Sequence, residues 1–120
     1  MKTLTNIGRI VYAIPFLIFG LFHFLSANQM ASSILNGWPA NLFIVYLTGV
    51  ALVLAGISIL INKVARTASL LLALFLLLTI ALVHLPGLAN EETMRMAMSN
   101  ALKDMGLMGA AIAFAGILKS

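Results

Sequence analysis

The stretch Asn100-Ala101-Leu102-Lys103-Asp104 stands at the start of the last apolar run of the chain. It contains the one place in the sequence where a basic and an acidic residue are neighbours, Lys103 and Asp104. An ionisable residue in a membrane span is costly, and by default it indicates a site with its partner close by. The pair therefore predicts a polar site at the edge of a membrane-spanning helix.

The composition is that of an integral membrane protein. Of the 120 residues, 62% are hydrophobic and 8% are charged, and the mean hydropathy is +1.12. A small globule buries only part of its surface, so a soluble domain of this size could not hide so many apolar side chains. The net charge of +4 does not predict a nucleic-acid partner, because the basic residues are scattered near the ends of apolar runs. The sequence has no cysteine, which excludes disulfides and thiolate chemistry within the chain.

Four apolar stretches are long enough to cross a bilayer, which takes about 20 helical residues. Because they account for most of the chain, we predict an all-α fold with one domain over residues 1–120. That domain is an integral membrane bundle of four transmembrane helices. The first stretch could pass for a signal peptide, but we expect an uncleaved span. The spans are placed at 7–25, 41–62, 66–86 and 99–118.

The distribution of basic residues predicts the orientation in the membrane. An even number of spans puts both termini on one side, together with Lys2, Arg9, Lys63, Arg66 and Lys119. The other side receives Arg95, Lys103 and all three acids. The positive-inside rule then predicts that both termini are cytoplasmic.

The connection between the first two spans has a helical pattern of its own. Apolar residues recur at helical spacing with polar residues between them, which is typical of a short helix lying at the membrane surface. Asn36-Gly37 is expected to end this interfacial helix, and Trp38-Pro39 to anchor the chain at the interface. The apolar positions are Ala27, Met30, Ala31, Ile34 and Leu35.

Seven polar residues are predicted to lie at one depth. Two histidines end the outward-running spans, and the other five follow the starts of the inward-running spans. At 1.5 Å per residue, all of them fall in a layer on the order of 10 Å thick under the outer surface. Polar groups in such bundles face inward, so we expect one cavity that opens outward. The ligand-binding candidates are His23, Tyr46, Thr48, His84, Asn100, Lys103 and Asp104.

Each candidate also has a purely structural interpretation, and both interpretations stay open at this point. A histidine near the end of a span is more often a hydrogen-bonded or interfacial residue than a ligand. Lys103 could equally reach the lipid headgroups and leave Asp104 at the interface.

Haem and copper(I) are considered as cofactors, and both are less favoured than an organic ligand. His23 and His84 could be the axial ligands of a haem held between facing helices. Beyond Arg95 or Lys103, however, no basic residue is available for the propionates, so we expect no stoichiometric haem.

Soft thioethers favour copper(I), and the stretch Met94-Arg95-Met96-Ala97-Met98 resembles sites for that ion. In a helix Met94 and Met98 share a face while Met96 points elsewhere, so adaptable packing explains the methionines better. No metal is predicted; the weak candidate ligands are His23, His84, Met94 and Met98.

Several short motifs together resemble the DoxX and DoxX-like family of small four-span bacterial membrane proteins. Each motif alone is weak, whereas their order and spacing are fairly specific. One departure is that members of that family often have a glutamate after the Thr-Gly pair of the second span, where this chain has Ala51-Leu52-Val53. The motifs are Gly8-Arg9, Phe19-Gly20-Leu21-Phe22-His23-Phe24, Leu47-Thr48-Gly49-Val50, Arg66-Thr67-Ala68, His84-Leu85-Pro86 and Asn100 to Leu107.

The resemblance implies a protein of the bacterial inner membrane with redox or quinone-linked work at the outer face. The first hypothesis is a redox-linked, quinone-associated subunit or accessory protein, with a quinone or small lipophilic ligand near His23, His84 and Asp104. The alternative is a non-enzymatic assembly or scaffold protein for partner proteins. Other candidate partners are a redox protein and further copies of the chain. The sequence identifies no catalytic residue and no reaction. A transporter is disfavoured, because the inner halves of the first and third spans are uniformly apolar.

Overall fold

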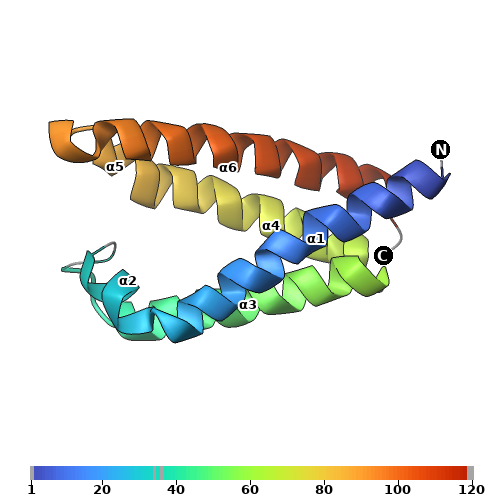
Figure 1. The fold of residues 1–120 in the computed structure, drawn as a ribbon, viewed down its shortest axis with the longest axis horizontal. Coiled ribbons are helices and arrows are strands. Elements are labelled where there is room, and N and C mark those ends of the chain that lie inside the picture. The colour runs from blue at the N-terminus through green and yellow to red at the C-terminus, as the bar shows by residue number, and fades with distance from the viewer. Residues whose placement is uncertain (1, 34, 36, 119–120) are drawn as a thin grey trace. The chain divides into compact units, whose positions relative to one another are not determined.

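The structure, a computed structural model, describes residues 2–33, 35 and 37–118. These residues form helices and connections, and no strand occurs among them. The chain divides into two compact units, Met1–Ala65 and Arg66–Ser120. Each unit is a pair of long helices joined at one end (Figure 1).

The first unit consists of α1 (Lys2–Leu25), α2 (Ala27–Ser33) and α3 (Asn41–Ile61). The long helices α1 and α3 run antiparallel (Figure 1). The buried residues of α3 recur at alternating steps of four and three, the spacing of a helix that packs along one stripe. They are Val45, Gly49, Leu52, Gly56 and Ile59.

Three glycines allow α1 and α3 to approach closely. A Cβ atom added to Gly20 would lie 2.5 Å from Cγ2 of Val53 and 3.0 Å from the carbonyl oxygen of Gly49. A Cβ on Gly49 would lie 2.8 Å from Cβ of His23, and one on Gly56 would lie 2.8 Å from Cδ2 of Leu17. In lipid, where apolar burial gives no advantage over the solvent, such close packing is a main source of helix association.

An arginine links the two ends of this hairpin. Nη1 of Arg9 donates to the carbonyl oxygen of Ile59 at 2.8 Å and also to that of Leu60. These carbonyls belong to the last turn of α3, where the regular hydrogen bonds from the residue four positions later end. The N–H of Asn62 also reaches the carbonyl oxygen of Ile59, at 3.3 Å. A cation at this position also interacts favourably with the helix dipole. We call this contact the Arg9 clamp.

The second unit begins with α4 (Ala65–Thr79) and a π-helical segment, η1 (Ile80–His84), followed by α5 (Leu85–Gly87) and α6 (Glu91–Ile117). It contains an equivalent of the Arg9 clamp. Nε of Arg66, at the start of α4, donates to the carbonyl oxygen of Ala115 in the last turns of α6 at 2.8 Å.

The side chain of Asn90 caps the start of α6. The Asn90 side chain accepts a hydrogen bond from the backbone N–H of Glu92 at 2.9 Å. Glu91 and Glu92 lie in the first turn, where the positive end of the helix dipole favours acids.

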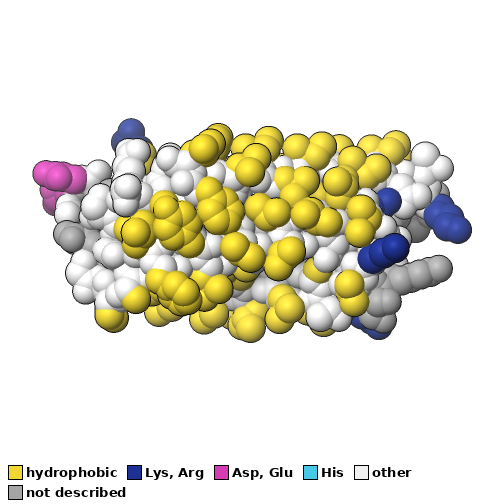
Figure 2. Space-filling model, turned by 90° about the horizontal axis from the view of Figure 1, so that it is seen from below, with side chains coloured by type: hydrophobic (Ala, Val, Ile, Leu, Met, Phe, Trp, Pro, Cys, Tyr) yellow, Lys and Arg dark blue, Asp and Glu magenta, His cyan; other side chains and the backbone are white. Residues whose placement is uncertain are grey.

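Three helical segments are long and apolar enough to cross a membrane: Lys2–Leu25, Asn41–Ile61 and Ala65–Gly87. They match the first three predicted spans closely. Hydrophobic side chains cover the flanks of the helices, with charged side chains toward the ends (Figure 2).

The fourth span is not confirmed. The helix α6 exists, but it is not among the membrane-span candidates. It carries Glu91, Glu92, Arg95, Lys103 and Asp104, and its charge-free part runs only from residue 105 to 117. At 1.5 Å per residue this part is about 20 Å long, which is short of a hydrocarbon core of about 30 Å.

Two further expectations are met only in part or not tested. The predicted helix between the first two spans exists as α2, but its location at the membrane surface stays a prediction. Gly37 has a φ of 86°, as expected for a chain that leaves a helix, while Ile34 and Asn36 lie outside the described residues. The single domain over residues 1–120 also stays a prediction.

Candidate functional site

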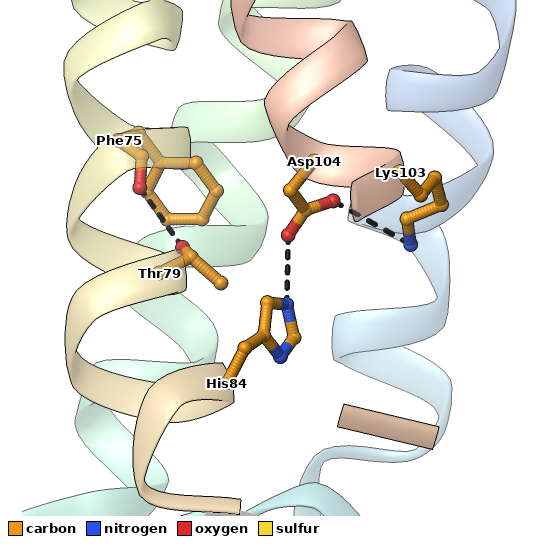
Figure 3. A network of polar contacts seen from close by, with 5 residues as sticks. All are labelled: Phe75, Thr79, His84, Lys103 and Asp104. Atoms are coloured by element: carbon orange, nitrogen blue, oxygen red, sulfur yellow. Dashed lines mark hydrogen bonds and ion pairs between the residues drawn. The ribbon is translucent and has the colours of Figure 1, made fainter. Parts of the chain in front are cut away.

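The pair His84–Asp104 is the most buried polar contact between side chains of the second unit. Nε2 of His84 lies 2.8 Å from Oδ2 of Asp104. The side chains are 13% and 8% exposed, respectively. Figure 3 shows His84 reaching Asp104 from the end of η1, while Asp104 comes from α6. A carboxylate with so little access to water requires hydrogen bonds, because an unpaired buried charge is strongly unfavourable.

Lys103 forms the second contact of the carboxylate. Its Nζ lies 3.6 Å from Oδ1 of Asp104, and its side chain is 50% exposed. Distance and exposure both make this the weaker of the two interactions. His84 is therefore the principal partner of Asp104, and Lys103 is a peripheral cation (Figure 3).

The position of His84 follows from the π-helical turn. The backbone N–H of Leu85 bonds to the carbonyl oxygen of Ile80, five residues earlier. Pro86 follows directly; its ring cannot donate a hydrogen bond and would clash with the carbonyl four residues before it in a regular α-helix. A π turn adds one residue and so rotates the side chains beyond it, and such turns are frequent at functional sites.

Thr79 precedes this turn but does not bond to the pair. Its hydroxyl donates to the carbonyl oxygen of Phe75 at 2.9 Å, within its own helix (Figure 3). The contact between Asp104 and His84 joins η1 to α6.

The hydrogen bond determines what the imidazole can do. An ionised carboxylate only accepts hydrogen bonds, so Nε2 of His84 carries the hydrogen. In the neutral ring Nδ1 is then an acceptor. Among the described residues, Nδ1 has no hydrogen-bond partner. The arrangement can therefore take up a proton at Nδ1 and stabilise the resulting cation.

The three candidates of the first unit engage other groups. Nδ1 of His23 lies 2.6 Å from the carbonyl oxygen of Phe19, one turn earlier in α1. The hydroxyl of Thr48 donates to the carbonyl oxygen of Val45 at 2.9 Å. The ring of Tyr46 stacks on Phe24 with the centroids 5.9 Å apart. A cavity shared by His23 and Asp104 stays a prediction, since the two residues belong to different units and each unit is described by itself.

The remaining candidates lie on α6. Asn100 is half-buried, one helical turn before Asp104. Met94 and Met98 are exposed, and so is Met96, so the described residues give them no packing role. No group of three or more His, Cys, Asp or Glu side chains able to hold a metal occurs within the described part of the chain.

The contacts of Arg9 and Arg66 with distant carbonyl oxygens were not predicted from the sequence. Both arginines were used only as basic residues of the predicted cytoplasmic side. Each arginine lies toward the start of the first long helix of its unit, and its carbonyl partner lies in the last turns of the second long helix. Antiparallel packing brings those two ends together.

Taken together, three apolar spans and a helical fold define a multi-pass helical membrane protein. The DoxX family model matches residues 4–85, which is more than half of the chain. The chain belongs to the DoxX family. No curated protein and no solved structure matches it.

The family match covers the first unit and the second unit up to Leu85. It therefore includes His23 and His84. The stretch from Asn100 to Leu107 lies beyond the matched residues, so its resemblance to the family pattern stays a prediction.

Proposed function

We propose that this DoxX-family chain is a redox-linked, quinone-associated membrane subunit or accessory protein. In this proposal, His84 and Asp104 exchange a proton with the ring of a bound quinone. The observation that carries the proposal is the hydrogen bond between Nε2 of His84 and the buried carboxylate of Asp104. Quinone chemistry couples electrons to protons, so a quinone site needs a group that can accept and return a proton.

The proton step balances as follows. In the oxidative direction, the two O–H bonds of a hydroquinone break in turn. Each proton forms an N–H bond at Nδ1 of His84, which releases the first proton to water before it takes up the second. The electrons pass from the hydroquinone ring to a partner redox protein, which the proposal requires as the electron acceptor. Asp104 stabilises the imidazolium through Nε2–H. Reduction of a quinone reverses each transfer.

The proposed setting is the bacterial inner membrane with both termini in the cytoplasm. Lys2, Arg9 and Lys63 of the first unit and Arg66 of the second support this orientation. In this orientation α4 and η1 run outward, so His84 lies toward the outer face, and the site exchanges its proton with that side.

The test measures quinone binding by the full chain in lipid nanodiscs with decylubiquinone as the probe. We expect a saturable rise of the melting temperature for the unmodified chain, since a ligand that binds only the folded state stabilises it. We expect Asp104→Asn and His84→Phe to weaken binding at least ten-fold. The matched control Glu92→Gln makes the same change from carboxylate to amide at an exposed position of α6 and should leave binding unchanged.

Two results would overturn the proposal. One is the absence of any saturable effect of the quinone on the unmodified chain. The other is equal binding by the unmodified chain and both site variants. A protein that binds no quinone but is purified with a partner protein in a fixed ratio would instead support the assembly alternative.

A further inference from the structure

We propose that the first unit contains a separate binding site for an uncharged, polyhydroxylated headgroup such as a sugar. The site is a cavity of about 260 Å³ at the junction of α1, α2 and α3. The residues that line it and carry the argument are Phe24, Ser26, Asn28, Gln29 and Tyr46. All of them belong to the first unit, so the site does not depend on His84 or Asp104.

The lining contains three polar side chains that can bond to a ligand, those of Ser26, Asn28 and Tyr46. The hydroxyl of Ser26, the amide of Asn28 and the phenol of Tyr46 have no hydrogen-bond partner among the described residues. Serine, asparagine and tyrosine side chains each offer both a donor and an acceptor. A ligand that satisfies them needs donors as well as acceptors, which hydroxyl groups supply. A quinone carbonyl only accepts.

The charge of the lining excludes anionic and cationic headgroups. No acidic or basic side chain occurs among the described residues that line the cavity. Recognition of a phosphate or carboxylate normally uses arginine or lysine, and recognition of an amine uses a carboxylate. The ligand is therefore uncharged.

The aromatic wall favours a ring. Phe24 and Tyr46 stack with an interplanar angle of 29° and both line the cavity. Their rings provide an apolar surface on which the C–H groups of a sugar can pack, with the tyrosine hydroxyl free for a polar contact. The volume lies just below the range of about 300–1,000 Å³ typical of sites for drug-sized ligands, so a single ring suits it.

The place of the cavity agrees with a headgroup. It lies where α1 ends and α2 begins, at the end of a membrane-span candidate. A polar head bound here would leave its apolar tails alongside the span. A sugar free in water would satisfy the same groups, and the experiment separates these two sources.

The experiment uses the full chain in phosphatidylcholine nanodiscs with increasing mole fractions of monoglucosyl diacylglycerol. We expect a saturable rise of the melting temperature that neither diacylglycerol with the same tails nor phosphatidylglycerol reproduces. Any rise caused by decylubiquinone should be the same in the Asn28→Ala and Tyr46→Phe variants as in the unmodified chain. Asn28→Ala and Tyr46→Phe should raise the half-saturating mole fraction at least five-fold. Asn6→Ala, the same change near the other end of α1, should leave it unchanged. Competition by methyl glucoside would identify a free sugar as the ligand, and lack of competition a glycolipid.

Three outcomes would overturn the site. The glucosyl lipid could stabilise the protein no more than diacylglycerol does. The Asn28 and Tyr46 variants could respond to it as the unmodified chain does. Finally, decylubiquinone could saturate with the same dependence on Asn28 and Tyr46, which would assign the cavity to an acceptor-only ring. Because Tyr46→Phe removes a single oxygen atom, loss of folding would not obscure its result.

Discussion

In the first unit, α1 and α3 meet through glycines, whereas the second unit joins η1 to α6 through a buried carboxylate and a histidine. Added Cβ atoms at Gly20 and Gly49 would collide with the opposite helix. In α6, Cβ atoms added to Gly106, Gly109 and Gly116 would meet nothing within 4 Å. The same residue type thus forms a helix contact between α1 and α3 and leaves open space along α6.

This difference shows which of the two units accommodates buried polar side chains. Close backbone packing needs no polar side chains, and the stripe of α3 contains none. The second unit keeps Asp104 at 8% side-chain exposure, at a cost that only hydrogen bonds offset. A buried carboxylate paired with a histidine is a weak source of stability, and the proposed proton exchange gives this pair a role apart from folding. The arginine clamps are what the two units share.

The largest expected effect comes from breaking the pair in the second unit. His84→Leu leaves the Asp104 carboxylate without its principal donor and should lower the free energy of unfolding by about 3 kcal/mol. Adding Asp104→Leu should restore most of the loss, because no buried charge remains. Lys103→Met should cost less than about 1 kcal/mol, since the lysine is half exposed. Urea unfolding in detergent measures each value, and a double variant as unstable as His84→Leu would contradict the expectation.

The next effect tests the glycines. Gly20→Ala places a Cβ atom 3.0 Å from a backbone oxygen of α3 and should cost about 2 kcal/mol through overpacking. Gly109→Ala has open space and should gain up to about 1 kcal/mol from helix propensity. Thermal unfolding, monitored by circular dichroism, shows whether each substitution stabilises or destabilises the chain. Destabilisation of similar size at both positions would remove the contrast between the units.

Substitution of either clamp arginine should cause a smaller loss in the free energy of unfolding. Arg9→Met removes bonds to two carbonyl oxygens, and Arg66→Met removes one. Hydrogen bonds to charged groups contribute about 1.5–3 kcal/mol where they are buried, so we expect about 1.5 kcal/mol for Arg9 and less for Arg66. Replacement by lysine should recover only part of the loss, because an ammonium group lacks the planar fork. Full recovery by lysine would reduce the clamps to simple charge effects.

The smallest effects are expected at the starts of α3 and α6, the second long helix of each unit. The side chain of Asn90 caps α6, whereas Ala40 precedes α3 with a φ of 53° and no side-chain bond. Asn90→Ala should cost about 1 kcal/mol. Ala40→Gly should gain about 0.5–1 kcal/mol, because glycine adopts this left-handed conformation without a steric penalty. Unfolding curves that show no gain for Ala40→Gly would mean that the αL position carries no strain.

Local signals in the sequence predicted much of the fold. Long apolar runs located three helices that can cross a membrane, and Gly37 marked a place where the chain leaves a helix. The family was predicted from short motifs and is confirmed over residues 4–85. The fourth span is the weak point, because Lys103 and Asp104 shorten the apolar part of α6.

The candidate site was predictable only as a set of residues. Helical rise placed His84 and Asp104 at one predicted depth, but it does not specify which side chains touch. Contact between residues 20 positions apart depends on how η1 and α6 are rotated, and the π turn before Pro86 sets that rotation. The stacked Phe24 and Tyr46 and the cavity beside them depend likewise on the turn between α1 and α2.

The sequence by itself determined the class of protein and the extent of its apolar helices, because composition and local periodicity act within single segments. The order of its short motifs indicated the family. Only the tertiary structure decided that His84 is the principal partner of Asp104, and that Arg9 and Arg66 bind carbonyl oxygens at distant helix ends. It also decided that Gly20 and Gly49 form a contact while Gly109 does not. These features depend on the rotation and register of packed helices, which arise from contacts between segments far apart in the chain.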